Sequence, residues 1–191
     1  AAFVAAAGNA AGNNDSSPMY PANYDVPNLI SVAAVTDSSY LAAFSNFGKS
    51  SVHLGSPGVM IYSSVPGGWG TASGTSMATP FVSGVAIQMK VESPQMLGYQ
   101  IKSIIFSQAN PVATLVGKVY TESRLDAAGA ISYAQTAQVD SSQPAYYGAF
   151  SQNRELASGI SGGGCGLVHK LYKNSQNRFG DGPPLPRGPQ T

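Results

Sequence analysis

The segment 75–92 constrains the fold of this sequence more than any other part. Apolar residues recur along it at near-helical spacing, at Met77, Phe81, Val85 and Met89. The positions between them are also largely apolar, which predicts a helix buried on nearly every side in the centre of a domain. We expect Gly84 to allow close packing of this helix on a sheet, since an interior helix glycine otherwise costs about 1 kcal/mol relative to alanine.

Ser76 lies at the first turn of this predicted helix, among small residues. A hydroxyl there faces the unpaired backbone N–H groups and the positive end of the helix dipole. An anion that formed beside it would be stabilised. We expect Pro80 to be tolerated because the first turn lacks internal donors. Position alone favours a simpler interpretation, in which Ser76 only caps the helix.

Asn9 follows the apolar run 1–7, which predicts a strand buried on both faces of a parallel sheet. Its side-chain amide could donate a hydrogen bond to an oxyanion if it lay near Ser76. In isolation, the Gly8-Asn9 pair is more simply explained as a turn. Because a domain rarely begins on its central strand, we expect this sequence to be part of a longer protein.

The remaining patterns alternate between strands and helices. Strands are predicted at 29–35, 60–65 and 118–120, and a short strand and turn at 51–58. Helices are predicted from residue 93 and, following the segment 124–128, up to about residue 138. Lys102 is expected on the outer face of the first of these two helices. The segment 66–70 is predicted to be a turn, with Trp69 used for packing rather than as a substrate platform. This alternation is typical of an α/β fold.

Composition excludes several classes of protein. Only 10% of the residues are charged and the net charge is +1, which argues against nucleic acid or an anionic membrane as partner. No apolar run is long enough to span a bilayer. Residues 139–191 are rich in Gly, Pro, Ser and Gln, which predicts an irregular or disordered tail. Its single cysteine, Cys165, is either a site of lipidation or processing or, more simply, a free thiol.

Two segments resemble a known family. The run Ser-Gly-Thr-Ser-Met-Ala-Thr-Pro at 73–80 is similar to the nucleophile signature of the subtilisin-like serine peptidases, or subtilases. The run Ala-Ala-Ala-Gly-Asn at 5–9 is similar to the family segment that ends in the oxyanion-hole asparagine. The likeness continues to about residue 138. It implies an α/β fold with a three-layer, subtilisin-like parallel sheet and flanking helices, its N-terminal portion missing, over residues 1–138.

The resemblance also implies a serine endopeptidase that works through an acyl-enzyme at Ser76 with Asn9 in the oxyanion hole. The substrate-binding residues that it implies are Ala7, Gly8, Met19 and Thr75. Met19 falls at the floor of the primary specificity pocket and is expected to shorten it, although an ordinary core methionine explains it equally well.

The family's catalytic aspartate and histidine motifs do not occur in this sequence. They are therefore expected upstream, and this fragment alone is expected to be inactive. His53 lies in a segment where the family has no catalytic histidine, so we predict a structural role for it. His169, in the tail, has no partners that suggest a metal or a triad.

The expected partners are a peptide or protein substrate and the upstream part of the same protein, and the expected location is extracellular or the cell envelope. No cofactor is expected to be required. Structural calcium is expected only for a full-length family member, and one carboxylate, Asp37, is too little to assign a metal site here. The alternative function is a catalytically inactive subtilase-fold scaffold or binding module. Intact Ser76 and Asn9 argue against such decay.

Overall fold

The computed structural model describes residues 1–136. The predicted tail, with Cys165 and His169, lies outside the described residues. The boundary proposed at residue 138 also lies just beyond them and stays a prediction.

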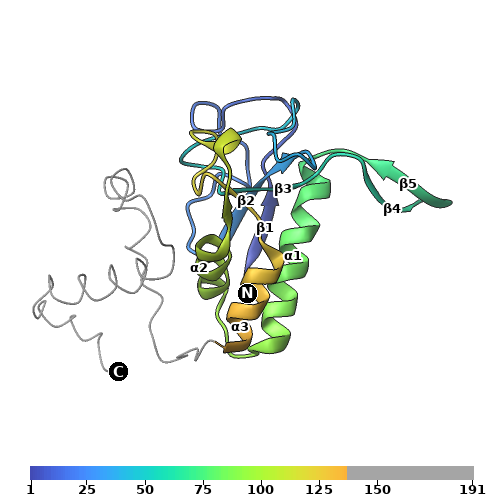
Figure 1. The fold of residues 1–191 in the computed structure, drawn as a ribbon. Helices are drawn as coiled ribbons and strands as arrows, with labels where there is room; N and C mark the ends of the chain where they lie inside the picture. The colour runs from blue at the N-terminus through green and yellow to red at the C-terminus, as the bar shows by residue number, and fades with distance from the viewer. Residues whose placement is uncertain (137–191) are drawn as a thin grey trace, which may run out of the picture.

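A mostly parallel sheet forms the centre of the described chain (Figure 1). Its strands, in spatial order, are β1 (Phe3–Ala6), β2 (Leu29–Val35), β3 (Leu54–Pro57), β7 (Ser123–Arg124) and β6 (Asn110–Pro111). Neighbouring strands are parallel except β6 and β7, which are antiparallel. With its helices, this sheet confirms the predicted α/β class.

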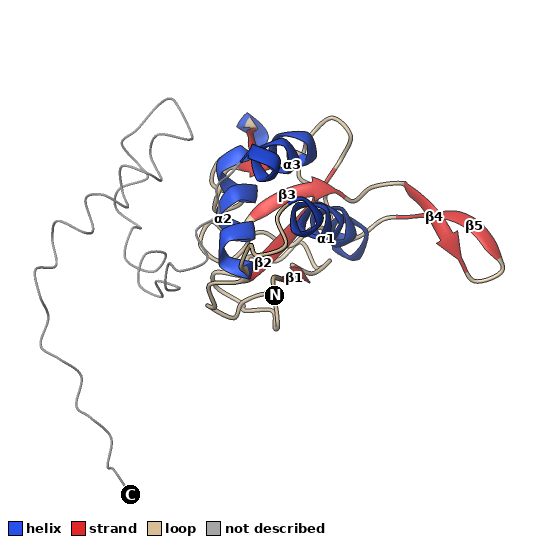
Figure 2. Cartoon of the chain, turned by 90° about the horizontal axis from the view of Figure 1, so that it is seen from below, coloured by secondary structure: helices blue, strands red, loops and turns tan. Residues whose placement is uncertain are grey.

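Three helices pack on one face of the sheet: α1 (Thr75–Glu92), α2 (Gly98–Gln108) and α3 (Ala127–Thr136) (Figure 2). Alternate residues of β2 divide between two cores, because successive side chains of a strand point to opposite faces. Ile30, Val32 and Ala34 join the helices, while Ala33 and Val35 join a smaller cluster with Val52, Leu115 and Val119. In the described residues this second face is covered by loops and the short helix η1 (Ala113–Leu115), so the third layer contains no α-helix.

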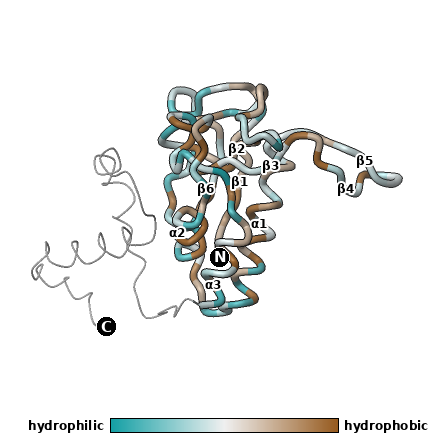
Figure 3. Tube along the Cα trace, viewed as in Figure 1, coloured by the Kyte–Doolittle hydropathy of each residue, from teal (hydrophilic) through white to brown (hydrophobic). Residues whose placement is uncertain are grey.

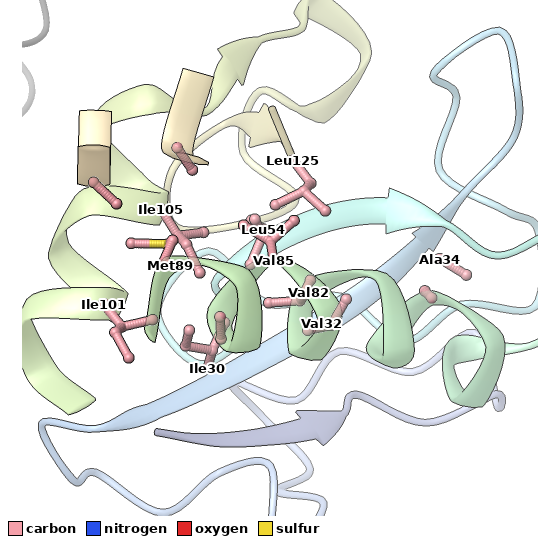
Figure 4. Packing of buried hydrophobic residues seen from close by; sticks show 14 of the residues in the cluster. Ile30, Val32, Ala34, Leu54, Val82, Val85, Met89, Ile101, Ile105 and Leu125 are labelled. Atoms are coloured by element: carbon pink, nitrogen blue, oxygen red, sulfur yellow. The ribbon is translucent and has the colours of Figure 1, made fainter. Parts of the chain in front are cut away.

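The main core lies between α1, the sheet and the other two helices (Figure 4). Its central side chains are fully or nearly fully buried: Ile30, Val32, Leu54, Val82, Met89, Ile101 and Ile105. Burying such a side chain contributes roughly 1.5–3 kcal/mol each. Figure 3 shows the hydrophobic stretches along α1 and α2 from which this core is built.

Helix α1 has the predicted bounds, but its burial differs from the prediction. Phe81, Ile87 and Val91 are 43%, 65% and 64% exposed and share one side of the helix. Gly84 lies on the same side, and a Cβ built there would meet nothing within 4 Å. The expected role of this glycine in close helix–sheet packing is therefore wrong. The side of α1 that faces the sheet contains Val82, Val85 and Met89 instead.

Strand β1 is also less buried than the sequence predicts. In the described part of the chain it pairs only with β2, and it forms one edge of the sheet. Phe3 is half exposed, so the strand is not buried on both faces.

Three local predictions are wrong for identifiable reasons. The second helix does not begin at Ser93, because the Ser93 N–H donates to the Met89 carbonyl and closes α1. Helix α2 begins at Gly98, where the Gln100 side chain accepts the Leu97 N–H. Lys102 is only 5% exposed and does not lie on the outer face. The expected strand at 118–120 is reduced to one bridge, between Val119 and Gly48.

The segment between β3 and α1 forms a hairpin that projects from the body of the domain (Figure 1). Its antiparallel strands are β4 (Ile61–Val65) and β5 (Gly68–Ala72), so the predicted turn at 66–70 is shorter than expected. Trp69 is 71% exposed and stacks on Tyr62, with ring centroids 5.9 Å apart. Its packing is thus confined to the hairpin.

Candidate active site

Ser76 is the second residue of α1 and is exposed to solvent. The entry to the helix is fixed by Gly74, whose N–H donates to the Gly58 carbonyl over 2.8 Å. Gly58 follows β3, and a Cβ there would lie 2.7 Å from the Ala34 Cβ and 2.8 Å from the Gly74 oxygen. Only glycine at position 58 lets the helix start so close to the sheet, and this contact sets the height of Ser76 above the strands.

Pro80 does not lie in the first turn of the helix, contrary to the prediction. The helix begins at Thr75, so Pro80 is its sixth residue and removes the bond that an N–H at this position would donate to the Ser76 carbonyl. The Thr79 hydroxyl donates to the neighbouring Thr75 carbonyl over 2.8 Å. Of the first-turn N–H groups, that of Thr75 donates to Asn9 Oδ1 over 2.9 Å and that of Met77 to the Gly74 carbonyl over 3.0 Å. The N–H of Ser76 has no acceptor inside the helix and could donate to an anion beside the helix end.

Asn9 lies beside Ser76 because Thr75 holds it there. The Asn9 Oδ1 atom accepts hydrogen bonds from the Thr75 N–H and the Thr75 hydroxyl, both over 2.9 Å. The Thr75 hydroxyl in turn accepts the Gly8 N–H over 3.2 Å. With its carbonyl oxygen engaged in this way, the Asn9 side chain directs its Nδ2 donor away from Thr75.

The position of Gly74 shows where this donor lies. A Cβ built at Gly74 would be 3.3 Å from Asn9 Nδ2 and 3.7 Å from the Ser76 nitrogen. Two N–H donors from residues 67 positions apart in the sequence, Asn9 and Ser76, therefore lie close to the same point beside Gly74. Such a pair of donors can stabilise a negatively charged oxygen.

The other predicted substrate-binding residues have different surroundings. Ala7 is fully buried, its N–H donates to Val32 and its carbonyl accepts from Asn14. Gly8 has a positive φ of 111°, which favours glycine, and packs against Met19, whose Cε would be 3.5 Å from a Cβ there. Met19 is 41% exposed. Thr75 is buried, and its polar atoms bind Asn9.

Sequence reasoning missed Asn46 and Asn14, two buried amides that bind the turn after β1. Sequence analysis alone gives little reason to single them out, since each lies in a loop rich in polar residues. A buried role could have been suspected for Asn46, because it stands between Phe44 and Phe47.

His53 lies just before β3, at the opposite end of that strand from Gly58 and about 16 Å from it along the chain. Its Nδ1 accepts the Ser31 N–H over 2.7 Å, and its Nε2 lies 3.4 Å from the Lys102 Nζ. Burial, followed by the charge of Lys102, lowers the pKa of His53 to about 3. Burial also lowers the pKa of Lys102 to about 8, against an opposing effect of Asp25. A histidine in this position cannot act as a base for Ser76.

Within residues 1–136 no group of three or more His, Cys, Asp or Glu side chains is placed to hold a metal ion. The same residues contain no helix of the length and hydrophobicity needed to cross a membrane.

The chain matches the model of the subtilase family over residues 1–155. This match covers most of the sequence, and the chain belongs to the subtilase family. It is similar to the subtilisin-like protease 2 of Plasmodium falciparum, with 44% identity over 85 residues, or 44% of this chain and 6% of that protein. It is also similar to the subtilisin of Bacillus subtilis subsp. amylosacchariticus, with 42% identity over 108 residues, or 56% of this chain and 28% of that protein.

Solved structures show the same relationship. The chain superposes on the subtilase cytotoxin SubAB with a TM-score of 0.63 and 29% identity, over 70% of this chain and 49% of that one. A protease from Pseudoalteromonas arctica gives a TM-score of 0.61 and 30% identity, over 68% of this chain and 41% of that one. The chain thus spans less than half the length of these relatives.

Proposed function

We propose that this chain is the part of a subtilisin-like serine endopeptidase that carries the nucleophile, Ser76, and the oxyanion donor, Asn9. The full protein hydrolyses peptide bonds through an acyl-enzyme. The observation that carries this proposal is the pair of donors, Asn9 Nδ2 and the Ser76 N–H, that border the space at Gly74.

In the first step the Ser76 hydroxyl oxygen attacks the scissile carbonyl carbon and gives up its proton to a base. The carbonyl oxygen becomes an anion and accepts hydrogen bonds from Asn9 Nδ2 and the Ser76 N–H. The C–N bond then breaks, the nitrogen leaves with the proton that the base took from Ser76, and the acyl group stays bound to the Ser76 oxygen. Water gives a proton to the same base and attacks this ester, and the same two donors stabilise the second oxyanion. The bond from the acyl carbon to the Ser76 oxygen then breaks, Ser76 takes the proton back and the acid product leaves.

The base and its orienting carboxylate belong to residues outside this sequence. His53 is unsuitable, because both its ring nitrogens face other groups at the far end of β3. Among residues 1–136 one edge of β1 is unpaired and an apolar side of α1 is exposed, which supports a covering segment here. That segment supplies the histidine and aspartate of a subtilase triad.

The substrate is a peptide or protein that lies over Gly8, Thr75 and Met19. Met19 borders the turn that carries Asn9, and it shortens the pocket for the side chain before the cleaved bond. Low charge, at 10% of residues, suits an enzyme that works outside the cell or in the cell envelope. No cofactor is required by this chemistry, and any structural calcium belongs to the full-length protein.

The test is labelling of the full-length protein by a fluorophosphonate, with the Ser76→Ala variant as control. We expect one label, at Ser76, and loss of peptide hydrolysis in the variant. Asn9→Ala should retain labelling but lose turnover by about 10²–10³-fold, the loss known for this donor in a subtilisin. Absence of label at Ser76 in a folded full-length protein would sink the proposal.

A second candidate is an inactive scaffold of the same fold, favoured by the absence of a usable base among residues 1–136. The two candidates differ in the residues that precede this sequence. A scaffold would bind peptides without a Ser76-dependent cleavage step, whereas the endopeptidase would form an acyl-enzyme at Ser76.

A further inference from the structure

The turn that carries Asn9 lies along a second segment, residues 44–48. The Asn46 N–H donates to the Gly8 carbonyl over 2.8 Å, and the Ala11 N–H donates to the Phe44 carbonyl over 2.8 Å. The Phe47 N–H donates to the Gly12 carbonyl over 3.0 Å. The backbone after β1 is thus supported on both sides of Asn9 by this one segment.

The side chain of Asn46 adds two bonds that the backbone alone could not make. Its Oδ1 accepts the N–H groups of Ala10 and Gly12 over 2.8 Å and 3.1 Å. Asn46 is only 3% exposed, and its Nδ2 lies against Gly8, where a Cβ would be 2.6 Å away. Removing this amide would leave two N–H groups of the turn without their acceptor, which costs more than a bond made at the surface.

Asn14 holds the Asn46 amide in its orientation. The Asn46 Nδ2 donates to Asn14 Oδ1 over 2.9 Å, and Asn14 Nδ2 donates to the Ala7 carbonyl over 2.9 Å. Asn14 is 1% exposed. Both side-chain amides therefore have hydrogen-bond partners for their oxygen and their nitrogen. Together they connect Ala7, before the turn, with Ala10 and Gly12, after Asn9.

The same network reaches the predicted specificity pocket. The Asn23 Nδ2 donates to the Asn14 carbonyl over 2.8 Å, and Asn23 Oδ1 accepts the Met19 N–H over 3.1 Å. Asn23, Asn14 and Asn46 thus form a series of amides between the loop of Met19 and the turn of Asn9.

We propose that Asn46, oriented by Asn14, is a positioning residue that holds the turn of Asn9 so that its Nδ2 meets the developing oxyanion. The proposal rests on the proposed function, because it concerns the same oxyanion site. Asn46 touches neither the substrate nor the reacting atoms and acts only through Asn9. A small displacement of a donor matters here, since a misplacement of about 1 Å can cost about 10²-fold in rate.

The experiment compares Asn46→Ala with Asn13→Ala in the full-length protein, each with and without Asn9→Ala. Asn13 is the matched control, because it is an exposed asparagine of the same loop whose side chain accepts a local N–H, from Asp15. Rates are normalised to the concentration of sites that a fluorophosphonate titrates. Asn14→Ala is a milder second variant, which keeps the two acceptor bonds of Asn46.

We expect Asn46→Ala to lower kcat by about 10- to 100-fold with little change in KM, and Asn13→Ala to change neither. In the Asn9→Ala background the loss from Asn46→Ala should disappear, because the donor that it positions is absent. An equal loss in both backgrounds, or no loss, would overturn the proposal and leave the proposed function intact.

Hydrogen exchange provides a readout that is independent of activity. The Ala10 and Gly12 amides should exchange faster in Asn46→Ala than in Asn13→Ala, and unchanged exchange would overturn the proposal. If the parent protein had no Ser76-dependent turnover, the proposed function would fail while the exchange would still decide whether Asn46 supports the turn.

Discussion

Among single residues, Thr75 links the helix of the nucleophile to the oxyanion donor through one hydroxyl group. This group donates to Asn9 Oδ1 and accepts the Gly8 N–H. Thr75→Val preserves the shape of the side chain but removes both bonds. We expect kcat of the full-length protein to fall about tenfold or more, with KM little changed, because only transition-state binding is lost.

Thr75→Ser is the matched control, since it keeps the hydroxyl and loses a methyl group. It should retain most of the activity in steady-state kinetics on a peptide substrate. A Thr75→Ser variant as impaired as Thr75→Val would show that packing of the methyl group, and not the hydroxyl, is what matters.

The buried pair of His53 and Lys102 makes stability depend on pH. The pKa of His53 is lowered from 6.5 to about 3, so between these values the unfolded chain binds a proton that the folded chain does not. Stability therefore falls as the pH drops from about 6.5 toward 3. For Lys102, lowered from 10.5 to about 8, the same reasoning gives stability that rises as the pH increases from about 8 toward 10.5.

Denaturant unfolding of the full-length protein at a series of pH values measures both effects, in a Ser76→Ala background that prevents self-cleavage. His53→Asn retains an acceptor for the Ser31 N–H and should give a shallower loss of stability in acid. Lys102→Met should abolish the alkaline rise. Identical acid slopes for the parent and His53→Asn would contradict the assignment to His53.

Residue-scale predictions failed where the surroundings of a side chain depend on distant contacts. Lys102 is predicted on the outer face because its own helix suggests this. It is instead buried in contact with His53, which is 49 residues away in the sequence. Asn46 is likewise ordinary in its own segment, and its bonds are made to residues 34 to 36 positions earlier.

At the scale of elements, alanine substitutions at two glycines, Gly84 inside α1 and Gly58 before it, should change stability in opposite directions. A Cβ at Gly84 would meet nothing within 4 Å, so Gly84→Ala should stabilise the protein by about 0.5–1 kcal/mol through helix propensity. A Cβ at Gly58 would lie 3.0 Å or less from Ala34, Gly74 and Ala78. Gly58→Ala should therefore destabilise the protein by about 1–3 kcal/mol.

Thermal unfolding of the two variants in the Ser76→Ala background checks this pair. A loss of stability in Gly84→Ala would show that the exposed side of α1 is covered by a tightly packed segment in the full-length protein. Gly84 would then have the close-packing role that the described residues do not provide.

Elements with a long, unambiguous pattern could be predicted from the sequence. Helix α1 and strand β2 have the predicted bounds, because apolar residues fill each of them and turn residues border them. The start of α2 could not be predicted, since Ser93 and Pro94 suit a helix start and a tight turn equally well. Only the first strand of the β4–β5 hairpin is predicted, because the second strand contains two glycines, which favour a turn.

For the whole molecule, the described residues leave one side incomplete. In residues 1–136 strand β1 has an unpaired edge, and α1 exposes Phe81, Ile87 and Val91. An exposed strand edge together with an apolar helix surface favours association with another chain or segment. The class of fold was predictable from alternating patterns, but this surface was not, because the periodicity of α1 predicts burial without saying what covers it.

We therefore expect the 191-residue chain, produced alone, to be poorly soluble and not to react with a fluorophosphonate at Ser76. The nucleophile would have no base, and the exposed surface of β1 and α1 would promote aggregation. Production together with the preceding segment of the full-length protein should restore both solubility and labelling, as measured by gel filtration and by mass spectrometry of the Ser76 peptide. Replacing Ile87 and Val91 with Arg or Glu should improve the solubility of the isolated chain without restoring labelling. This result would separate the low solubility from the absence of a base. Robust hydrolysis by the isolated chain would show instead that a base for Ser76 lies within these 191 residues.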